Sequence, residues 1–217
     1  MDMGCFAMEN RMIITIGRQY GSGGREIGRR LAEKLAIPFY DKELIELAAK
    51  ESGMAEEVFE QVDEKAGSSL LYALSTGSMM GSHFAPLNNL TFNDRLFLLQ
   101  NQIIRDIAEK GPAVIVGRCA NYVLRERGDV VNVFVHAGLQ ERIARAVSEY
   151  GHPEKDAAGI VQKIDKSRAN YYDHYTGEKW GVAKQYHLTL DSGVGLDHCV
   201  ELIERYAEMS RKLVGER

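Results

Sequence analysis

The sequence predicts an α/β fold built on a doubly wound sheet of five mainly parallel strands. Short apolar runs rich in β-branched residues alternate along the chain with longer amphipathic segments, and this alternation is typical of βαβ units. The runs have the length of buried strands, whereas the segments between them show helical periodicity. The expected strands are residues 12–16, 37–41, 113–118, 130–137 and 186–192.

The first strand, residues 12–16, leads through a glycine-rich loop to a helix that begins near Arg25. This helix is expected because apolar residues recur at every fourth position, at Ile27, Leu31 and Leu35. A strand, a glycine-rich loop and a helix in this order open many phosphate-binding sites. The loop is therefore the first candidate for a functional site.

The middle of the chain changes in composition. Residues 67–94 are rich in Gly, Ser, Asn and Met and show weak periodicity, which favours loops and short helices. Residues 95–111 then form a clear amphipathic helix that ends before Pro112. We expect residues 54–110 to be a helical insertion between the second and third strands.

The second half of the chain continues the alternation. Helices are expected at residues 139–151 and 196–214, after the fourth and fifth strands. The polar, tyrosine-rich residues 152–180 lie between these helices and are expected to project from the domain. Residues 1–11 are expected to be a flexible tail, which leaves residues 12–217 as a single domain.

The composition favours a soluble, cytoplasmic protein. The formal net charge of −4 gives no overall attraction to nucleic acid or to an anionic membrane surface, and no apolar run is long enough to span a bilayer. The three cysteines, Cys5, Cys119 and Cys199, show no metal-ligand spacing, and such a scattered set favours reduced thiols. We expect neither nucleic acid nor a membrane as a partner.

The glycine-rich loop, residues 17–24, allows three interpretations. A tight turn needs glycine for positive φ, but the loop has four glycines in eight residues. A dinucleotide site would use Gly21 and Gly23, with Asp41 near a ribose hydroxyl. That fingerprint begins directly after the strand, however, and here three residues separate Gly17 from Gly21. A phosphate cradle fits the longer loop better, because successive N–H groups must surround the anion.

Six segments carry a family resemblance: ITIGRQYGSGGREIGRRLAEKL, FYDKELIELAA, AVIVGRCANYVL, VFVHAGLQERIARAV, SRANYYDHYTGEKWG and YHLTLDS. In order and spacing, they resemble the cytidylate kinase-like branch of the P-loop nucleoside monophosphate kinases over residues 12–210. The resemblance implies a P-loop NTPase-like fold, with ATP and Mg²⁺ as cofactors. It also implies that residues 54–110 supply acceptor-binding helices and that residues 152–180 form a lid.

The resemblance assigns the phosphate cradle to residues in and after the glycine loop. Gly24 stands where ordinary cytidylate kinases have the P-loop lysine, and Glu26 stands at their magnesium-binding hydroxyl. Arg25 is the nearest cation and is expected to act on the phosphates. Glu26 and Asp41 are the expected magnesium ligands, with a helix cap as the alternative role of Asp41. The expected cradle residues are Gly21, Ser22, Gly23, Gly24, Arg25 and Glu26.

The resemblance also gives roles to four later arginines. Residues 116–119 replace the family's Asp-Gly-Arg-Asp, so Arg118 is kept and both carboxylates are absent. Arg118 is expected to contact the phosphate of the acceptor, and Arg168 of the lid the transferring phosphate. Arg142 and Arg145 are expected to face the phosphates of the nucleotide. The alternatives are a capping salt bridge for Arg118, a surface position for Arg142 and Arg145, and a tyrosine-rich packing face for the segment that contains Arg168.

Together these features predict an ATP-dependent kinase that acts on a small, nucleoside monophosphate-like phosphate acceptor. Residues 40–47, YDKELIEL, replace the family's monophosphate-binding Ser and Tyr-Arg, so CMP itself is expected to bind weakly. The alternative is a non-catalytic nucleotide sensor, because the lysine and the carboxylates are missing. A homodimer through the tyrosine-rich segment is also left open.

Overall fold

The computed structural model describes residues 12–42, 45 and 91–215. Within them, five strands form one sheet in the order β2-β3-β1-β4-β5, and every neighbouring pair is parallel. This confirms the predicted fold class. The strands are β1 (Ile13–Arg18), β2 (Phe39–Tyr40), β3 (Ala113–Val116), β4 (Val130–His136) and β5 (Leu188–Asp191).

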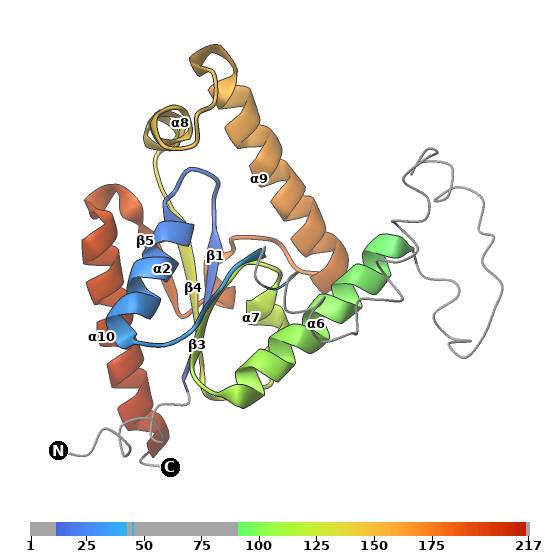
Figure 1. Cartoon of the computed structure of the whole chain (residues 1–217), viewed down its shortest axis with the longest axis vertical. Helices are drawn as coiled ribbons and strands as arrows, with labels where there is room; N and C mark the ends of the chain where they lie inside the picture. Colours follow the sequence, from blue (N-terminus) through green and yellow to red (C-terminus); the bar gives the residue numbers. More distant parts are fainter. Residues whose placement is uncertain (1–11, 43–44, 46–90, 216–217) are drawn as a thin grey trace.

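Helices cover both faces of the sheet (Figure 1). α2 and α10 pack on one face, and α6 packs on the other with the short α7. α8 and α9 stand above the carboxyl edge of the strands. The helices are α2 (Gly24–Leu35), α6 (Phe92–Lys110), α7 (Ala120–Val123), α8 (Leu139–Ser148), α9 (Glu154–Thr176) and α10 (Leu196–Gly215).

β1 lies at the centre of the core. Ile14 and Ile16 pack with α2 and α10, whereas Ile13 faces α6, and all three are fully buried. Successive side chains of a strand point to opposite faces, so a run of isoleucines supplies an apolar surface to both helical layers. Thr15 interrupts this run on the α6 side, where its Oγ1 donates to Asn132 Oδ1 at 2.6 Å.

The predicted insertion, residues 54–110, falls mostly outside the described residues. Its last part is α6, whose N-cap Thr91 accepts a hydrogen bond from the Asp94 amide in a capping box. The apolar stripe of this helix, with Leu99 and Ile103, packs against the sheet. This part of the segment therefore belongs to the core of the domain.

Residues 152–180, the predicted lid, contain α9, a single helix of 23 residues. α9 passes above the carboxyl edge of the sheet, from the α8 corner towards α6 (Figure 1). The predicted tail, residues 1–11, lies outside the described residues. None of the described helices combines the length and the apolar character that crossing a membrane requires.

Candidate active site

The glycine loop proper, residues 19–23, joins β1 to α2. Gly21 and Gly23 have φ angles of 77° and 74°, a left-handed conformation that glycine adopts without steric cost. Gly23 is the N-cap of α2, and no side chain of the described residues caps this end of the helix. The first amides of α2 are therefore open to a ligand, which is the arrangement that binds phosphate at helix N-termini.

Side chains from elsewhere in the fold hold the carbonyl oxygens of this loop. The donors are Arg168 to Arg18 at 3.0 Å, Arg142 to Tyr20 at 3.3 Å, Arg145 to Gly21 at 2.8 Å and Ser192 to Ser22 at 2.7 Å. These bonds fix the carbonyl side of the loop, while the amides of residues 24–26 are the backbone donors that the N-terminus of α2 offers to an anion.

Asp165 connects the loop to α9. One of its oxygens accepts the Tyr20 amide at 2.7 Å, and the other forms an ion pair with Arg142. The Tyr20 hydroxyl lies 2.7 Å from His152 Nε2, and Arg168 Cζ lies 5.4 Å from the centroid of the Tyr20 ring. The loop and the α8–α9 corner are thus packed together through one tyrosine.

Arg142 and Arg145, which we call the bracing arginines, act on the backbone of the loop. The sequence predicts that they face the nucleotide phosphates, but in the structure both donate to loop carbonyls. Arg142 is buried against Asp165, and Arg145 pairs with Glu149 at 3.3 Å. Their charges are therefore balanced by carboxylates, and their position maintains the shape of the loop.

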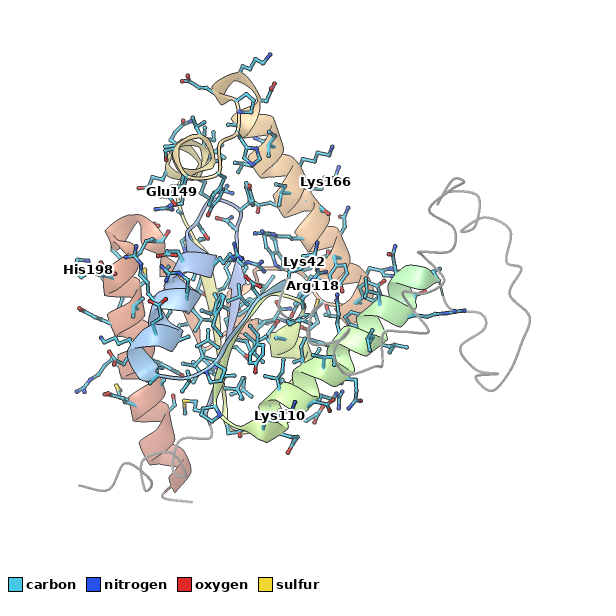
Figure 2. All side chains as sticks on the ribbon, in the orientation of Figure 1. Lys42, Lys110, Arg118, Glu149, Lys166 and His198 are labelled. Atoms are coloured by element: carbon cyan, nitrogen blue, oxygen red, sulfur yellow. The ribbon has the colours of Figure 1, made fainter. Side chains whose placement is uncertain are left out.

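A cavity of about 230 Å³ opens at the carboxyl edge of β1 and β3, beneath α9. Arg118 and Lys42 both line this cavity and are labelled near the centre of Figure 2. Arg18 and Arg168 also line it, and we call Arg18, Arg118 and Arg168 the cavity arginines. Ligands of α/β sheets bind at this edge, so the cavity is the candidate acceptor site.

The described residues that line the cavity carry an excess of positive charge. Burial and the nearby guanidinium groups of Arg168 and Arg118 lower the pKa of Arg18 to about 9, and Asp41 offsets this shift only in part. Burial also lowers the pKa of Arg168, although Asp165 acts in the opposite direction. Because Arg18 remains protonated at neutral pH, the cavity favours an anionic ligand.

Sequence reasoning missed Arg18. In the sequence it is only one of the residues that separate Gly17 from Gly21. In the structure it ends β1, and a Cβ atom on Gly117 would lie 2.0 Å from its Nη1, so the guanidinium fills the space beside that glycine. The available signal was its position directly after a buried strand, where parallel sheets bind ligands.

Aromatic side chains form the wall of the cavity towards α9. Tyr171 and Tyr172 come from α9, and Trp180 and Tyr186 come from the segment after it. Arg118 Cζ lies 5.7 Å from the centroid of the Tyr171 ring. Burial raises the pKa of Tyr171 and of Tyr172 to about 12, so both hydroxyls stay protonated. This wall suits a ligand with a planar or apolar body beside its anionic group.

Arg25 does not direct its charge into the cradle. Its Nε and Nη2 donate to Asp41 Oδ2 at 2.7 and 2.6 Å. The Arg25 side chain is 62% exposed, whereas that of Asp41 is 4% exposed. As placed, Arg25 offers the cradle its backbone amide, and the predicted role of its guanidinium on the phosphates does not match this geometry.

The predicted magnesium ligands, Glu26 and Asp41, have separate arginine partners. Hydrogen bonds from Arg29 and Arg30 lower the pKa of Glu26 to about 2, while Asp41 pairs with Arg25. Among the residues that the structure describes, no three His, Cys, Asp or Glu side chains come together where a metal could bind. These carboxylates do not fit a magnesium site as placed, and we derive no step through a metal held by them.

Comparison with known proteins assigns the chain to a family. A model of the cytidylate kinase-like family matches residues 13–194, most of the chain. The chain belongs to the cytidylate kinase-like family. This confirms the resemblance seen in the sequence, and it supports a small-molecule kinase in general terms.

Two solved structures share the fold of this cytidylate kinase-like protein. An uncharacterized protein from Eubacterium ventriosum ATCC 27560 is 27% identical, with a TM-score of 0.68, over 91% of this chain and 98% of that chain. Shikimate kinase from Bacteroides thetaiotaomicron is 13% identical, with a TM-score of 0.52, over 91% of this chain and 98% of that chain. The second likeness shows the fold alone. No match was found among curated proteins.

Proposed function

We propose that this cytidylate kinase-like protein is an ATP-dependent kinase that transfers the γ-phosphoryl group to a small, phosphate-bearing acceptor of the nucleoside monophosphate type. The observation that carries the proposal is the cationic cavity directly beside the open amides of α2. Arg18 lines the cavity, and the glycine loop begins at the next residue. A donor on the loop and an acceptor in the cavity would meet at one edge of the sheet, as phosphoryl transfer requires.

This reaction needs no nucleophile from the protein. An oxygen of the acceptor attacks the γ-phosphorus, the bond from that phosphorus to its bridging oxygen breaks, and ADP leaves with the electron pair. The protein must position both phosphates, exclude water and place positive charge around the moving group. Open amides, a helical lid and half-buried arginines are the features that such a task needs.

The site divides into a donor part and an acceptor part. In this proposal, the amides of residues 24–26 hold the donor phosphates, and Ser192 with the bracing arginines keeps the loop in shape. Arg118 and Arg168 face the acceptor and the transferring group from β3 and the lid. The aromatic wall receives the planar body of the acceptor.

Mg²⁺ is the expected companion of ATP. It keeps several water ligands even when bound in proteins and is often held through substrate phosphates. In this proposal it is carried by the nucleotide and water, and no side chain is assigned to it.

A non-catalytic nucleotide sensor is the second candidate function. It is favoured by one observation, that neither side chain expected to replace the missing P-loop chemistry faces the cradle. Arg25 is turned to Asp41, and Glu26 is held by Arg29 and Arg30. Such a protein would bind ATP without consuming it.

A coupled assay of ADP release over a panel of nucleoside monophosphates, combined with ATP calorimetry, tests both candidates. A kinase gives ATP binding and ADP release that depends on the acceptor. ATP binding without acceptor-dependent release would favour the sensor, and absence of ATP binding would reject both. We expect CMP to be a poor acceptor, and tight CMP binding would contradict the inference from residues 40–47.

A further inference from the structure

The structure shows why position 24 has no room for a lysine side chain beside Arg18. An ideal Cβ atom on Gly24 would lie 2.6 Å from Arg18 Cβ and 3.1 Å from Arg18 Cγ. The first of these atoms is attached to the backbone of β1, so it cannot move aside as the end of a flexible side chain can. In this backbone, an arginine at position 18 and a lysine at position 24 exclude each other.

A second glycine makes room for the other end of the same arginine. Gly117 follows β3 with a φ of 82°, and its missing Cβ leaves the space that Arg18 Nη1 occupies. Arg18 is therefore accommodated at its stem by Gly24 and at its guanidinium by Gly117. Two glycines from different elements open a path for one cation from β1 into the cavity.

The guanidinium of Arg18 has no protein acceptor in the part of the chain that the structure describes. Arg118, Arg168 and Arg25 act on it as like charges, and Asp41 is the carboxylate that acts on it. Asp41 already receives two donors from Arg25. A planar guanidinium with five donors and no partner next to other guanidinium groups calls for an external anion.

We propose that Arg18 is the cation of the phosphate site, in place of the lysine of the glycine loop, and that the cavity arginines form one subsite for a dianionic phosphoryl group. The inference deepens the proposed function and rests on it. A guanidinium binds phosphate oxygens through paired donors, whereas an ammonium acts as a point charge. Arg18 brings that charge from β1 to the junction of the open amides and the cavity, where the transferring group would sit.

Calorimetric titration with phenyl phosphate, a dianion with an aromatic body, tests the subsite without turnover. Arg18→Gly should weaken binding about tenfold or more, because charge-assisted hydrogen bonds to the phosphate are lost. Gly24→Lys alone should also weaken binding, because the new side chain collides with the stem of Arg18. The double variant Arg18→Gly/Gly24→Lys moves the cation to the usual position and should regain affinity to within about threefold of the wild type.

Arg205→Met is the matched control. Arg205 lies on α10, its side chain is 75% exposed, and it pairs with Glu208, so its loss should leave phenyl phosphate binding unchanged. Arg18→Met repeats the central comparison with the side-chain stem retained, and thermal melting checks that each variant is folded.

Three results would overturn the inference: no binding by the wild type, wild-type affinity in both Arg18 variants, or no recovery in the double variant. ADP release measured on the same proteins separates this inference from the proposed function. Binding that depends on Arg18, without acceptor-dependent ADP release, would reject the kinase and leave the subsite standing.

Discussion

The bracing arginines and the cavity arginines flank one loop in opposite electrostatic surroundings. Arg142 and Arg145 are paired with Asp165 and Glu149, and they donate hydrogen bonds to backbone carbonyls of the loop. The cavity arginines line one open space, and burial together with the like charges of Arg168 and Arg118 lowers the pKa of Arg18. The same residue type is a structural support in one place and a candidate ligand-binding group in the other.

The difference shows that the presence of a nearby carboxylate, more than the arginine itself, indicates whether an arginine supports the fold or binds a ligand. A buried arginine with its own acid contributes to the fold, and removing it leaves that acid uncompensated. A buried arginine among other arginines destabilises the fold until an anion binds, so such a placement points to a ligand. The two groups should therefore respond to substitution with opposite signs in stability.

The largest effect on stability is expected at Gly21, where the loop packs against the backbone of Arg142. Gly21 has a φ of 77°, and a Cβ atom there would lie 2.5 Å from the carbonyl oxygen of Arg142. Gly21→Val should lower the free energy of unfolding by about 3 kcal/mol or more and abolish ATP binding. Denaturant unfolding and calorimetry measure the two effects.

Glycine at position 159 provides the control for this prediction. A Cβ on Gly159 in α9 would meet nothing within 4 Å, so Gly159→Ala should be neutral or stabilise by up to about 1 kcal/mol. Wild-type ATP affinity in folded Gly21→Val would mean that the loop is only a turn.

The second effect concerns the bracing arginines themselves. Arg142→Met leaves Asp165 without its partner at a site where the two side chains are only 10% and 16% exposed. We expect the free energy of unfolding to fall by about 2 kcal/mol, with weaker ATP binding because the Tyr20 carbonyl also loses a donor. Arg142→Met/Asp165→Leu should recover part of the stability in denaturant unfolding. An unchanged midpoint in the single variant would contradict the bracing role.

The third effect has the opposite sign. Arg18→Met should raise the free energy of unfolding by about 1 kcal/mol. This is well below the free energy that corresponds to the full pKa shift, because water in the cavity screens the repulsion. The folded-state pKa of Arg18, about 9, is below its ordinary value, so the destabilisation is full below pH 9 and declines as the pH rises above it.

Thermal melts across this range should therefore show the advantage of Arg18→Met shrinking above pH 9. A variant that is less stable than the wild type at neutral pH would remove the contrast between the two groups.

The smallest effect is expected on the outer surface of α2. The pKa of Glu26 is lowered to about 2 from 4.5 by Arg29 and Arg30, so its stabilisation is present above pH 4.5 and is lost as the pH falls towards 2. Its side chain is 30% exposed, and Glu26→Gln should cost only about 0.5 kcal/mol at neutral pH. Parallel unfolding curves for the two proteins should converge near pH 2. A gap that persists there would rule out the ion pairs as its source.

The strands and the glycine loop could be predicted because their signals are local. The isoleucine run of β1 and the glycines at positions 21 and 23 each report a backbone requirement at their own position. α9 was harder to foresee as one continuous helix, because its residues are polar around most of its circumference and lack a strong apolar stripe.

The contacts of the site could not be predicted, because they depend on partners distant in the sequence. Arg25 reaches Asp41 and Arg142 reaches Asp165, and no local pattern signals either pair. The direction of Arg18 depends on glycines that belong to two other elements. The resemblance therefore predicted arginines that lie around the loop and the cavity, but it did not predict what each of them contacts.

The close approach of Gly24 to Arg18 also constrains the mutational history of such a loop. A lysine gained at position 24 while the arginine remains would meet the 2.6 Å contact, and an arginine lost first would leave the loop without either cation. The two single-step routes between these arrangements thus pass through an impaired intermediate. Descendants of either form would be expected to keep it, a case of epistasis that arises from one pair of neighbouring atoms.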